Sequence, residues 1–296
     1  MCNLLLSNGL SSESNVLFII GNGFDISHGI KSKYENFREY LHSKNRNSLL
    51  HSLDVLFNNS GTLWGDLEGA LGEYDTDTIL EECRPDEDID YDHYMRSTAA
   101  IEDSPLYILD PTLEELTDEF KQWVDSISLA GVQKKFKNIS SRSLYLTFNY
   151  LETLEKIYSI PRDQVFHIHG SRLEHGGYVF GHDNPRQDAY SNDENTTDYE
   201  QEAKLNIVNV MNEYAKQYDQ NIRRCRLFSF NLQEIKKIIV IGHSLSKIDL
   251  PYFRELKKHI CPQVPWCISF HAKDDIPLTE QRCLNLHIKN YELFEV

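Results

Sequence analysis

The sequence contains short apolar runs that each end at a glycine or a polar residue. The first is Val16–Ile20, a continuous apolar run that stops at Gly21. A continuous run of this length, rather than an alternation of apolar and polar residues, is typical of a strand buried on both faces of a parallel sheet. Similar runs recur along the chain at Leu144–Phe148, Val165–Ile168, Ile238–Ile241 and Ile268–Phe270. These runs predict the strands of one mostly parallel sheet.

Stretches with helical spacing alternate with the apolar runs. Ser32 and Glu35 have the spacing of a capping box, which predicts a helix that starts after Ser32. Leu151–Tyr158 carries another apolar stripe, and Asp249 can cap a third helix in which Pro251 is tolerated in the first turn. Strands that alternate with helices predict an α/β fold, a mostly parallel sheet flanked by helices.

The region from about 60 to 140 interrupts this alternation. Apolar residues at helical spacing predict one helix over 63–71 and a longer one over 113–127. The acidic stretch Glu73–Asp92 and the polar stretch Arg186–Gln201 are expected to be solvated loops. We therefore expect one domain over residues 1–296, with a helical insertion at about 60–140.

The composition excludes several classes of partner. The chain of 296 residues has 30 Lys+Arg against 46 Asp+Glu, a formal net charge of -16, which argues against nucleic acid and anionic membranes as partners. The apolar runs are too short to cross a bilayer, and Met1–Leu10 lacks the basic start of a secretory signal. None of the six cysteines forms a C-x-x-C pair, so we expect reduced thiols, no structural zinc and a cytoplasmic protein.

Four of the predicted strands lead directly into polar or glycine-bearing motifs. In a parallel sheet such motifs meet at the carboxyl ends of the strands, the edge where doubly wound folds bind ligands. The motifs are Gly21–Asp25, Thr147–Tyr150, His167–Gly170 and Gly242–Leu245.

The glycine motif has two interpretations. Gly21 and Gly23 remove side chains where backbone N–H groups would have to approach a phosphate, but a tight structural turn would have the same sequence. The spacing to Gly29 is G-x-G-x5-G, which differs from the G-x-G-x-x-G of ordinary dehydrogenases.

The histidines and Asn149 also have alternative roles. If the strand continues through His169, then His167 and His169 share one face. His169 precedes Gly170 at the predicted strand end, where it can act as a general base near neutral pH. Asn149 either caps the next helix or holds a ribose or a water. A metal-dependent phosphoesterase or nuclease is an alternative, although strict ligand spacing is absent. Its ligands would be Asp25, His167, His169, His182 and Asp183.

These motifs resemble the sirtuin-like NAD-binding domains. The segment from Gly21 to Ile30, GNGFDISHGI, is similar to their glycine-rich turn. Thr147–Asn149 resembles the segment with the ribose-contacting Asn, and Ile168–Gly170 resembles the Leu-His-Gly segment with the catalytic His. Gly242–Leu245 is similar to the Gly-Thr-Ser-Leu nucleotide-binding turn, and the order along the chain agrees.

More narrowly, the chain resembles the bacterial abortive-infection AbiH family. The segments that carry this resemblance lie between about residues 16 and 270: IIGNGFD, LWGDLE, LTFNY, HIHG, GHDN and IGHSLSKIDLPYF. The second of them contains Trp64, Asp66 and Glu68. The chain departs from the sirtuin pattern at Asp25, which replaces a serine, and at Lys31, which replaces a proline. The four-cysteine zinc module of protein deacetylases is absent, which argues against acetyl-lysine peptides as substrates.

The resemblance implies a phage-defence effector that hydrolyses NAD to nicotinamide and ADP-ribose without a metal. His169 and Asn149 would be catalytic. The residues that would bind the nucleotide are Gly21, Asn22, Gly23, Phe24, Asp25, Gly29, Gly242, His243 and Ser244. Further candidate partners are a second copy of the chain and a phage-derived trigger or partner defence protein. A non-catalytic sensor that binds NAD or ADP-ribose is the second alternative.

Overall fold

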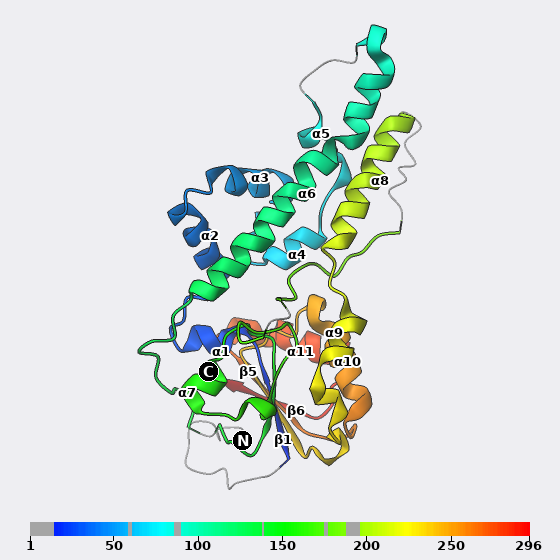
Figure 1. Cartoon of the computed structure of the whole chain (residues 1–296). Helices are drawn as coiled ribbons and strands as arrows, with labels where there is room; N and C mark the ends of the chain where they lie inside the picture. Colours follow the sequence, from blue (N-terminus) through cyan, green and yellow to red (C-terminus); the bar gives the residue numbers. More distant parts are fainter. Residues whose placement is uncertain (1–14, 59–60, 86–89, 138, 175–176, 188–195) are drawn as a thin grey trace. The chain divides into compact units, whose positions relative to one another are not determined.

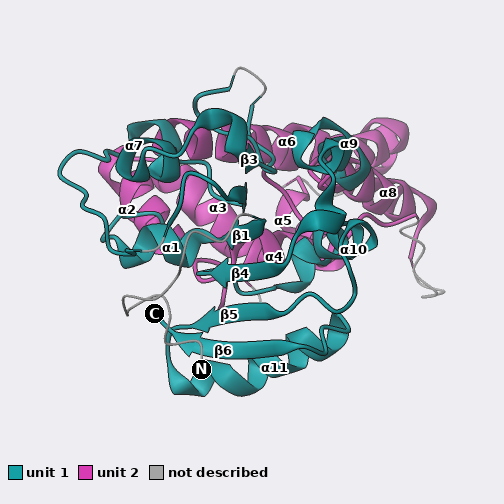
Figure 2. Ribbon diagram, turned by 90° about the horizontal axis from the view of Figure 1, so that it is seen from below, with its two compact units in different colours: residues 1–33, 124–179, 217–296 teal, residues 34–123, 180–216 magenta. Residues whose placement is uncertain are grey.

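A computed structural model describes residues 15–58, 61–85, 90–137, 139–174, 177–187 and 196–296 (Figure 1). Met1–Leu10 therefore lies outside the described residues. The chain divides into two compact units (Figure 2). The first comprises residues 1–33, 124–179 and 217–296, and the second comprises residues 34–123 and 180–216. The prediction of a single domain with an insertion at about 60–140 stays a prediction.

The first unit is built on a six-stranded sheet in which every pair of neighbouring strands is parallel. The strands lie in the order β3-β2-β1-β4-β5-β6. Their bounds are Val16–Ile20 for β1, Leu144–Thr147 for β2, Val165–His167 for β3, Lys237–Ile241 for β4, Trp266–Phe270 for β5 and Tyr291–Glu295 for β6. The predicted α/β fold with a mostly parallel sheet is confirmed. The edge strand β6 was not predicted.

Side chains of each strand pack into two cores, one on either face of the sheet. Leu17 and Ile19 of β1 pack with residues of α10, whereas Phe18 and Ile20 pack with Phe24 of α1 and with residues of α7. This alternation buries all of β1 and explains its unbroken apolar sequence. The helices of this unit are α1 (Asn22–Ser27), α7 (Thr153–Tyr158), α9 (Tyr218–Arg224), α10 (Leu250–His259) and α11 (Ile276–Asn285).

The described part of the second unit is helical. Its helices are α2 (Tyr34–Ser43), α3 (Asn47–Phe57), α4 (Leu67–Gly72), α5 (Thr76–Cys83), most of α6 (Tyr94–Ser126) and α8 (Asp198–Glu213). Within the described residues, the short 3-10 segments are Tyr91–His93, Arg162–Gln164, Arg226–Ser229, Leu232–Glu234, Lys247–Asp249 and Lys273–Asp275.

The acidic stretch Glu73–Asp92 is not simply a solvated loop, as the sequence suggested. Asp75 caps α5 by accepting a hydrogen bond from the Thr78 N–H, and Ile79 and Cys83 are buried. One apolar face is enough to hold an acidic helix, because its charges point to solvent. The polar stretch Arg186–Gln201 likewise contains the start of α8, while residues 86–89 and 188–195 of the two stretches lie outside the described part.

A buried ion pair lies inside the second unit. The Lys216 ammonium is 3.0 Å from the Glu68 carboxylate, whose other oxygen accepts a hydrogen bond from the Gly181 N–H at 3.0 Å. The Lys216 side chain has no exposed surface. Asp66 caps α4, and the Trp64 indole donates to Asp54. The LWGDLE segment therefore has a structural role in this unit.

Within the described residues, no helix combines the length and the apolar character that crossing a membrane requires. The cysteines in this part of the chain are free thiols: Cys83, Cys225, Cys261, Cys267 and Cys283.

Candidate functional site

The segments that follow β1, β2, β3 and β4 begin at the same edge of the sheet. The hydrogen bonds of the strands continue past their ends, since the Phe148 N–H donates to the Ile20 carbonyl at 2.9 Å. The Gly21 N–H donates to the Ile241 carbonyl at 3.0 Å in the same way. The strand order changes direction between β1 and β4, which is where ligands bind in open parallel sheets. The predicted motifs therefore converge on the edge expected for a ligand site.

The glycines of the first turn pack against the turn that follows β4. The Gly23 N–H donates to the Gly242 carbonyl at 2.8 Å, and a Cβ on Gly23 would lie 2.8 Å from the Gly242 Cα. A Cβ on Gly21 would lie 2.5 Å from the Cα of His243. Gly242 itself has a φ of +64°, a conformation that favours glycine. Close backbone packing therefore accounts for these glycines without a bound phosphate.

Other residues predicted to bind a nucleotide have structural partners of their own. Phe24 is fully buried and stacks on Phe136 with 5.3 Å between ring centroids. Gly29 has a φ of +75° and follows the end of α1, as expected of a glycine that stops a helix. Asn22 and Ser244 are exposed. Of the predicted set, these two present side chains to solvent at the turns.

Asp25 is fully buried in α1. Burial raises the pKa of its carboxyl from 3.8 to about 7, although Thr153, His167 and Asn149 each act to lower it. Desolvation is the dominant cause, because a buried carboxylate loses the water that stabilises its charge. Asp25 therefore changes its charge near neutral pH and lies beside Asn149.

We expect Asp25→Asn to stabilise the protein at alkaline pH. The pKa of Asp25 is higher in the folded state than in the unfolded one, so ionisation weakens the fold as the pH rises from about 4 to about 7. The stability of the variant relative to wild type should grow by about 4 kcal/mol between pH 4 and pH 8. Urea unfolding at both values measures this difference.

The control for this prediction is Asp274→Asn, because Asp274 is exposed. Its stability relative to wild type should not change between the two pH values. A relative stability of Asp25→Asn that is equally independent of pH would contradict a protonated carboxyl at this position.

Asn149 lies directly after β2, and its side chain is buried. Its N–H donates to the Thr147 hydroxyl at 3.1 Å, and its carbonyl is 2.8 Å from Nδ1 of His167. The next helix, α7, begins at Thr153 and has Glu152 at its N-cap position, so Asn149 is not a helix cap. Its buried Oδ1 has no hydrogen-bond partner within the described part of the chain. A buried amide oxygen of this kind requires a partner, which a ligand can supply.

An ion-pair network holds the loop between Asn149 and α7. Arg172 donates two hydrogen bonds to the buried Glu152 carboxylate, at 2.5 and 2.9 Å, and a third to the Ile127 carbonyl at 2.5 Å. Burial opposes the ionisation of Glu152, but hydrogen bonds from Arg172 and Lys156 outweigh it and lower its pKa to about 2. The network fixes the backbone that follows Asn149.

His167 has a structural role. Its Nε2 is 2.9 Å from the Glu155 carboxylate, and its Nδ1 is engaged by Asn149. Burial acts to lower the pKa of His167, but Glu155 outweighs it, so the pKa is raised. The strand ends at His167, so the alternation that was expected to put His167 and His169 on one face does not extend to His169.

His169 follows β3 and is buried, with 4% of its surface exposed. Its Nε2 is 3.5 Å from Oδ1 of Asp249. Phe148 and Tyr252 pack edge-on against its ring, with centroids 5.3 and 5.4 Å away. An imidazole in an apolar wall beside a carboxylate is an arrangement suited to general-base chemistry.

Asp249 was expected to cap a helix, and this prediction is wrong. Its backbone occupies the N-cap position of α10, but its side chain makes no capping hydrogen bond. The carboxylate faces two imidazoles instead, with Oδ2 3.3 Å from Nε2 of His243. Sequence reasoning missed these contacts, because an aspartate that caps a helix and one that faces imidazoles have the same sequence signature.

His243 is buried, although it was predicted to bind the nucleotide. Its Nδ1 accepts a hydrogen bond from the Leu245 N–H at 2.9 Å, and Leu245 has a φ of +55°. Phe148 and Phe253 pack against its ring. His243 is therefore a buried residue beside Asp249, and its side chain is not exposed at the turn.

The ligand set of the metal alternative is not assembled. His182 belongs to the second unit, where its Nε2 is 2.8 Å from the Met211 carbonyl and its Nδ1 accepts from the Asn184 N–H at 3.1 Å. Both ring nitrogens of His167 are also engaged. Across the described ranges, no group of three or more His, Cys, Asp or Glu residues is arranged to hold a metal.

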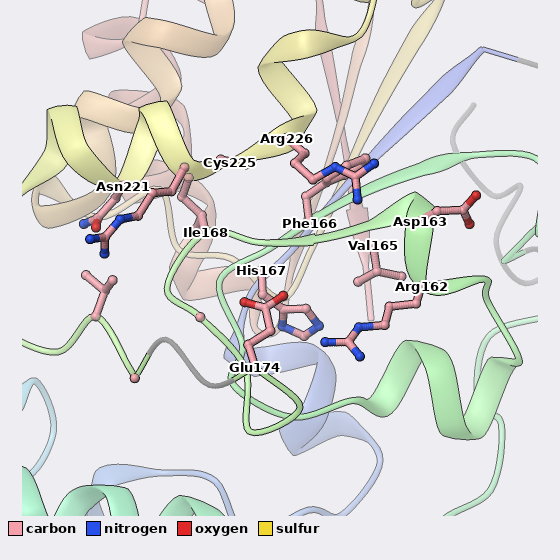
Figure 3. A pocket seen from close by; sticks show the side chains of 14 residues that line it. Arg162, Asp163, Val165, Phe166, His167, Ile168, Glu174, Asn221, Cys225 and Arg226 are labelled. Carbon is pink, nitrogen blue, oxygen red and sulfur yellow. The ribbon is translucent and has the colours of Figure 1, made fainter.

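A cavity of about 550 Å³ lies beside the edge strand β3 (Figure 3). His167 forms part of its wall, together with Arg162, Glu174, Cys225 and Arg226. Among the described residues, neither Asn149 nor His169 lines it. This cavity is therefore separate from the pair of residues predicted to be catalytic.

Three comparisons with known proteins were made, and one of them identifies the family of the chain. Curated proteins and solved structures gave no match. The sequence model of a family described as Bacteriophage abortive infection AbiH matches residues 17–270. This range covers most of the chain and contains every segment of the candidate site, from Gly21 to Asp249. The chain therefore belongs to the bacteriophage abortive infection AbiH family.

Proposed function

We propose that the protein is an abortive-infection effector that hydrolyses NAD to nicotinamide and ADP-ribose. Membership of the AbiH family indicates a role in abortive infection. The NAD chemistry is our proposal, and the observation that carries it is the convergence of Asn149 and His169 on the carboxyl edge of the sheet. These two residues resemble the Asn and His pair of sirtuin-like NAD hydrolases.

The topology of the sheet supports a dinucleotide ligand. The strand order 3-2-1-4-5-6 is that of Rossmann-type dinucleotide-binding folds, in which the ligand crosses the crevice beside β1 and β4. The glycine turn after β1 and the turn after β4 lie against each other at this crevice. We propose that NAD binds in this crevice, at the edge of the sheet where Rossmann-type and sirtuin-like domains bind their dinucleotide.

The nucleotide-binding residues can be divided by their exposure. Asn22 and Ser244 are exposed at the two turns and are our candidates for contact with the pyrophosphate and adenosine half. Gly21, Gly23 and Gly242 contribute through the close packing that shapes the turns. Phe24 and Gly29 stabilise the turn itself. The buried Asp25 contacts Asn149 and would influence the ligand only by positioning that amide.

The reaction breaks the bond between C1′ of the ribose and the nicotinamide nitrogen. The bond electrons stay with nicotinamide, which leaves as a neutral molecule, and C1′ develops oxocarbenium character. A water attacks C1′ and gives up its proton to His169, so the products are nicotinamide, ADP-ribose and one proton. The Asn149 amide holds the ribose or the water, which satisfies its buried Oδ1.

Incubation of the purified protein with NAD tests the proposal. We expect free nicotinamide and ADP-ribose, detected by chromatography, with and without EDTA. Loss of activity with EDTA would favour the metal-dependent phosphoesterase or nuclease. Binding of NAD without release of nicotinamide would favour the sensor. Absence of both binding and cleavage, in the presence of phage lysate as a source of trigger, would contradict the proposal.

A further inference from the structure

The cavity beside β3 lies outside the site described above, and its wall is in part apolar. Its volume of about 550 Å³ falls within the range of about 300–1,000 Å³ that small-molecule sites have. The described residues that line it all belong to the first unit. The apolar side chains of the wall are those of Val165, Phe166, Ile168 and Val179. The cavity is thus large enough for a small organic molecule and offers it an apolar surface.

Three arginines line the same cavity, although the chain as a whole is acidic. They are Arg162, Arg224 and Arg226, in a chain with 30 Lys+Arg and 46 Asp+Glu. Within the described part of the chain, none of their guanidinium groups has an ion-pair partner. Arg162 donates a hydrogen bond to the Leu173 carbonyl at 3.0 Å, which holds its side chain against the segment that leads to Glu174. The arginines therefore leave donors and positive charge available to an anionic ligand.

One of the two acidic residues of the wall points into the cavity. In Figure 3 the side chains of Arg162 and Glu174 point toward His167, whereas that of Asp163 points away from it. Burial raises the pKa of the Cys225 thiol to about 11, so the thiol is neutral. Glu174 adds to this rise and also acts to raise the pKa of His167, as a nearby negative charge does. Glu174 is therefore the group of the wall that would oppose an anionic ligand.

We propose that this cavity binds a nucleotide, with the phosphate group at the arginines and the base against the apolar part of the wall. The planar guanidinium group donates paired hydrogen bonds that match the oxygens of a phosphate. Inorganic phosphate would use the arginines alone, and an uncharged nucleoside would use the apolar surface alone, so a nucleotide is the class of ligand that fits both. The inference goes beyond the proposed function and does not rest on it, because neither Asn149 nor His169 is among the described residues that line the cavity.

Titration calorimetry of the purified protein tests the inference without NAD. The probes are the 5′-monophosphates of adenosine, guanosine, cytidine and uridine, each compared with its nucleoside and with inorganic phosphate. We expect at least one nucleotide to bind, and its nucleoside and inorganic phosphate to bind at least about tenfold more weakly, because each lacks one part of the contacts. Absence of binding by every nucleotide would overturn the inference, and so would an equal affinity for inorganic phosphate.

Variants of the arginines assign the bound nucleotide to the cavity. The test variant combines Arg162→Gln, Arg224→Gln and Arg226→Gln, and the control variant combines Arg142→Gln, Arg223→Gln and Arg254→Gln. The control removes the same charge from positions that do not line the cavity, and Arg223 lies at the same end of α9 as Arg224. The test variant should bind the nucleotide about a hundredfold more weakly, and the control should bind it within about twofold of wild type. All of these arginines are exposed, so both variants should keep the fold, which melting temperatures check.

Glu174→Gln should have the opposite effect on the affinity. It removes the carboxylate that points into the cavity, so the nucleotide should bind about threefold more tightly. Asp163→Asn is the matched control, because that carboxylate points away and its removal should change the affinity less than about twofold. A nucleotide bound in the crevice beside β1 and β4 would not respond to the cavity variants. Equal affinities of wild type, the arginine variant and Glu174→Gln would therefore overturn the inference, whatever the outcome for NAD cleavage.

Discussion

Replacement of His169 by alanine is expected to lower the rate of NAD cleavage about a thousandfold, within the range that general-base catalysis contributes. The imidazole accepts the proton of the attacking water, and Asp249 faces it at 3.5 Å. Asn149→Ala should reduce the rate to a similar degree, because the amide at the end of β2 is proposed to hold the ribose or the water. Both variants should bind NAD while releasing little nicotinamide, as measured by calorimetry and chromatography.

A matched histidine provides the control. His259 is 38% exposed in its side chain and lies at the end of α10, where it contacts Glu255 at 3.0 Å. His259→Ala should keep wild-type turnover. Near wild-type turnover in His169→Ala or Asn149→Ala would show that the site assignment is wrong. Melting temperatures of all three variants separate loss of chemistry from loss of folding.

The strands of the sheet could be predicted because a buried parallel strand has a distinctive sequence. Residues 16–20 are apolar throughout since both faces of β1 are covered, and the prediction has the bounds of the strand. The edge strand β6 was missed because its sequence, YELFE, alternates apolar and acidic residues and has no continuous apolar run. The other strands could be predicted because burial on both faces requires a continuous apolar run.

Several helices were missed although their sequences carried signals. In α3, Leu49, Leu53 and Leu56 have helical spacing and are buried. In α8, the capping box of Thr197 and Glu200 marks the start. Of the two, only α8 begins inside a stretch that was interpreted as a loop, Arg186–Gln201. Local polarity and helical burial coexist because only one face of a helix needs to be apolar.

The candidate site was predicted in part. The end of each strand can be located from the sequence, so the positions of Asn149 and His169 at the sheet edge could be anticipated. The pairing of His169 with Asp249 could not, because the two residues are distant in the chain and the pairing depends on side-chain directions. The contact between Gly23 and Gly242 is likewise a tertiary feature, and it explains glycines that the sequence attributed to phosphate binding.

Removal of the Lys216 charge is expected to destabilise the second unit strongly. The Lys216 ammonium is fully buried 3.0 Å from the Glu68 carboxylate, which also accepts the Gly181 N–H. In Lys216→Met the carboxylate stays buried without this cation, which should reduce the free energy of unfolding by about 4 kcal/mol. Urea unfolding monitored by circular dichroism measures the change.

A second variant tests whether charge is the cause. Glu68→Gln combined with Lys216→Met removes both charges and keeps an acceptor for the Gly181 N–H, so it should recover most of the lost stability. Lys258→Met is the matched control, because Lys258 pairs with Glu255 at an exposed position and should lose less than about 1 kcal/mol. If Lys216→Met lowered the free energy of unfolding no more than Lys258→Met does, the ion pair of Glu68 would not be what stabilises the LWGDLE segment. Recovery of stability in the double variant would show that the unpaired charge causes the loss. The contacts of residue 68 with residues 181 and 216 would then hold the segment 180–216 within its own unit.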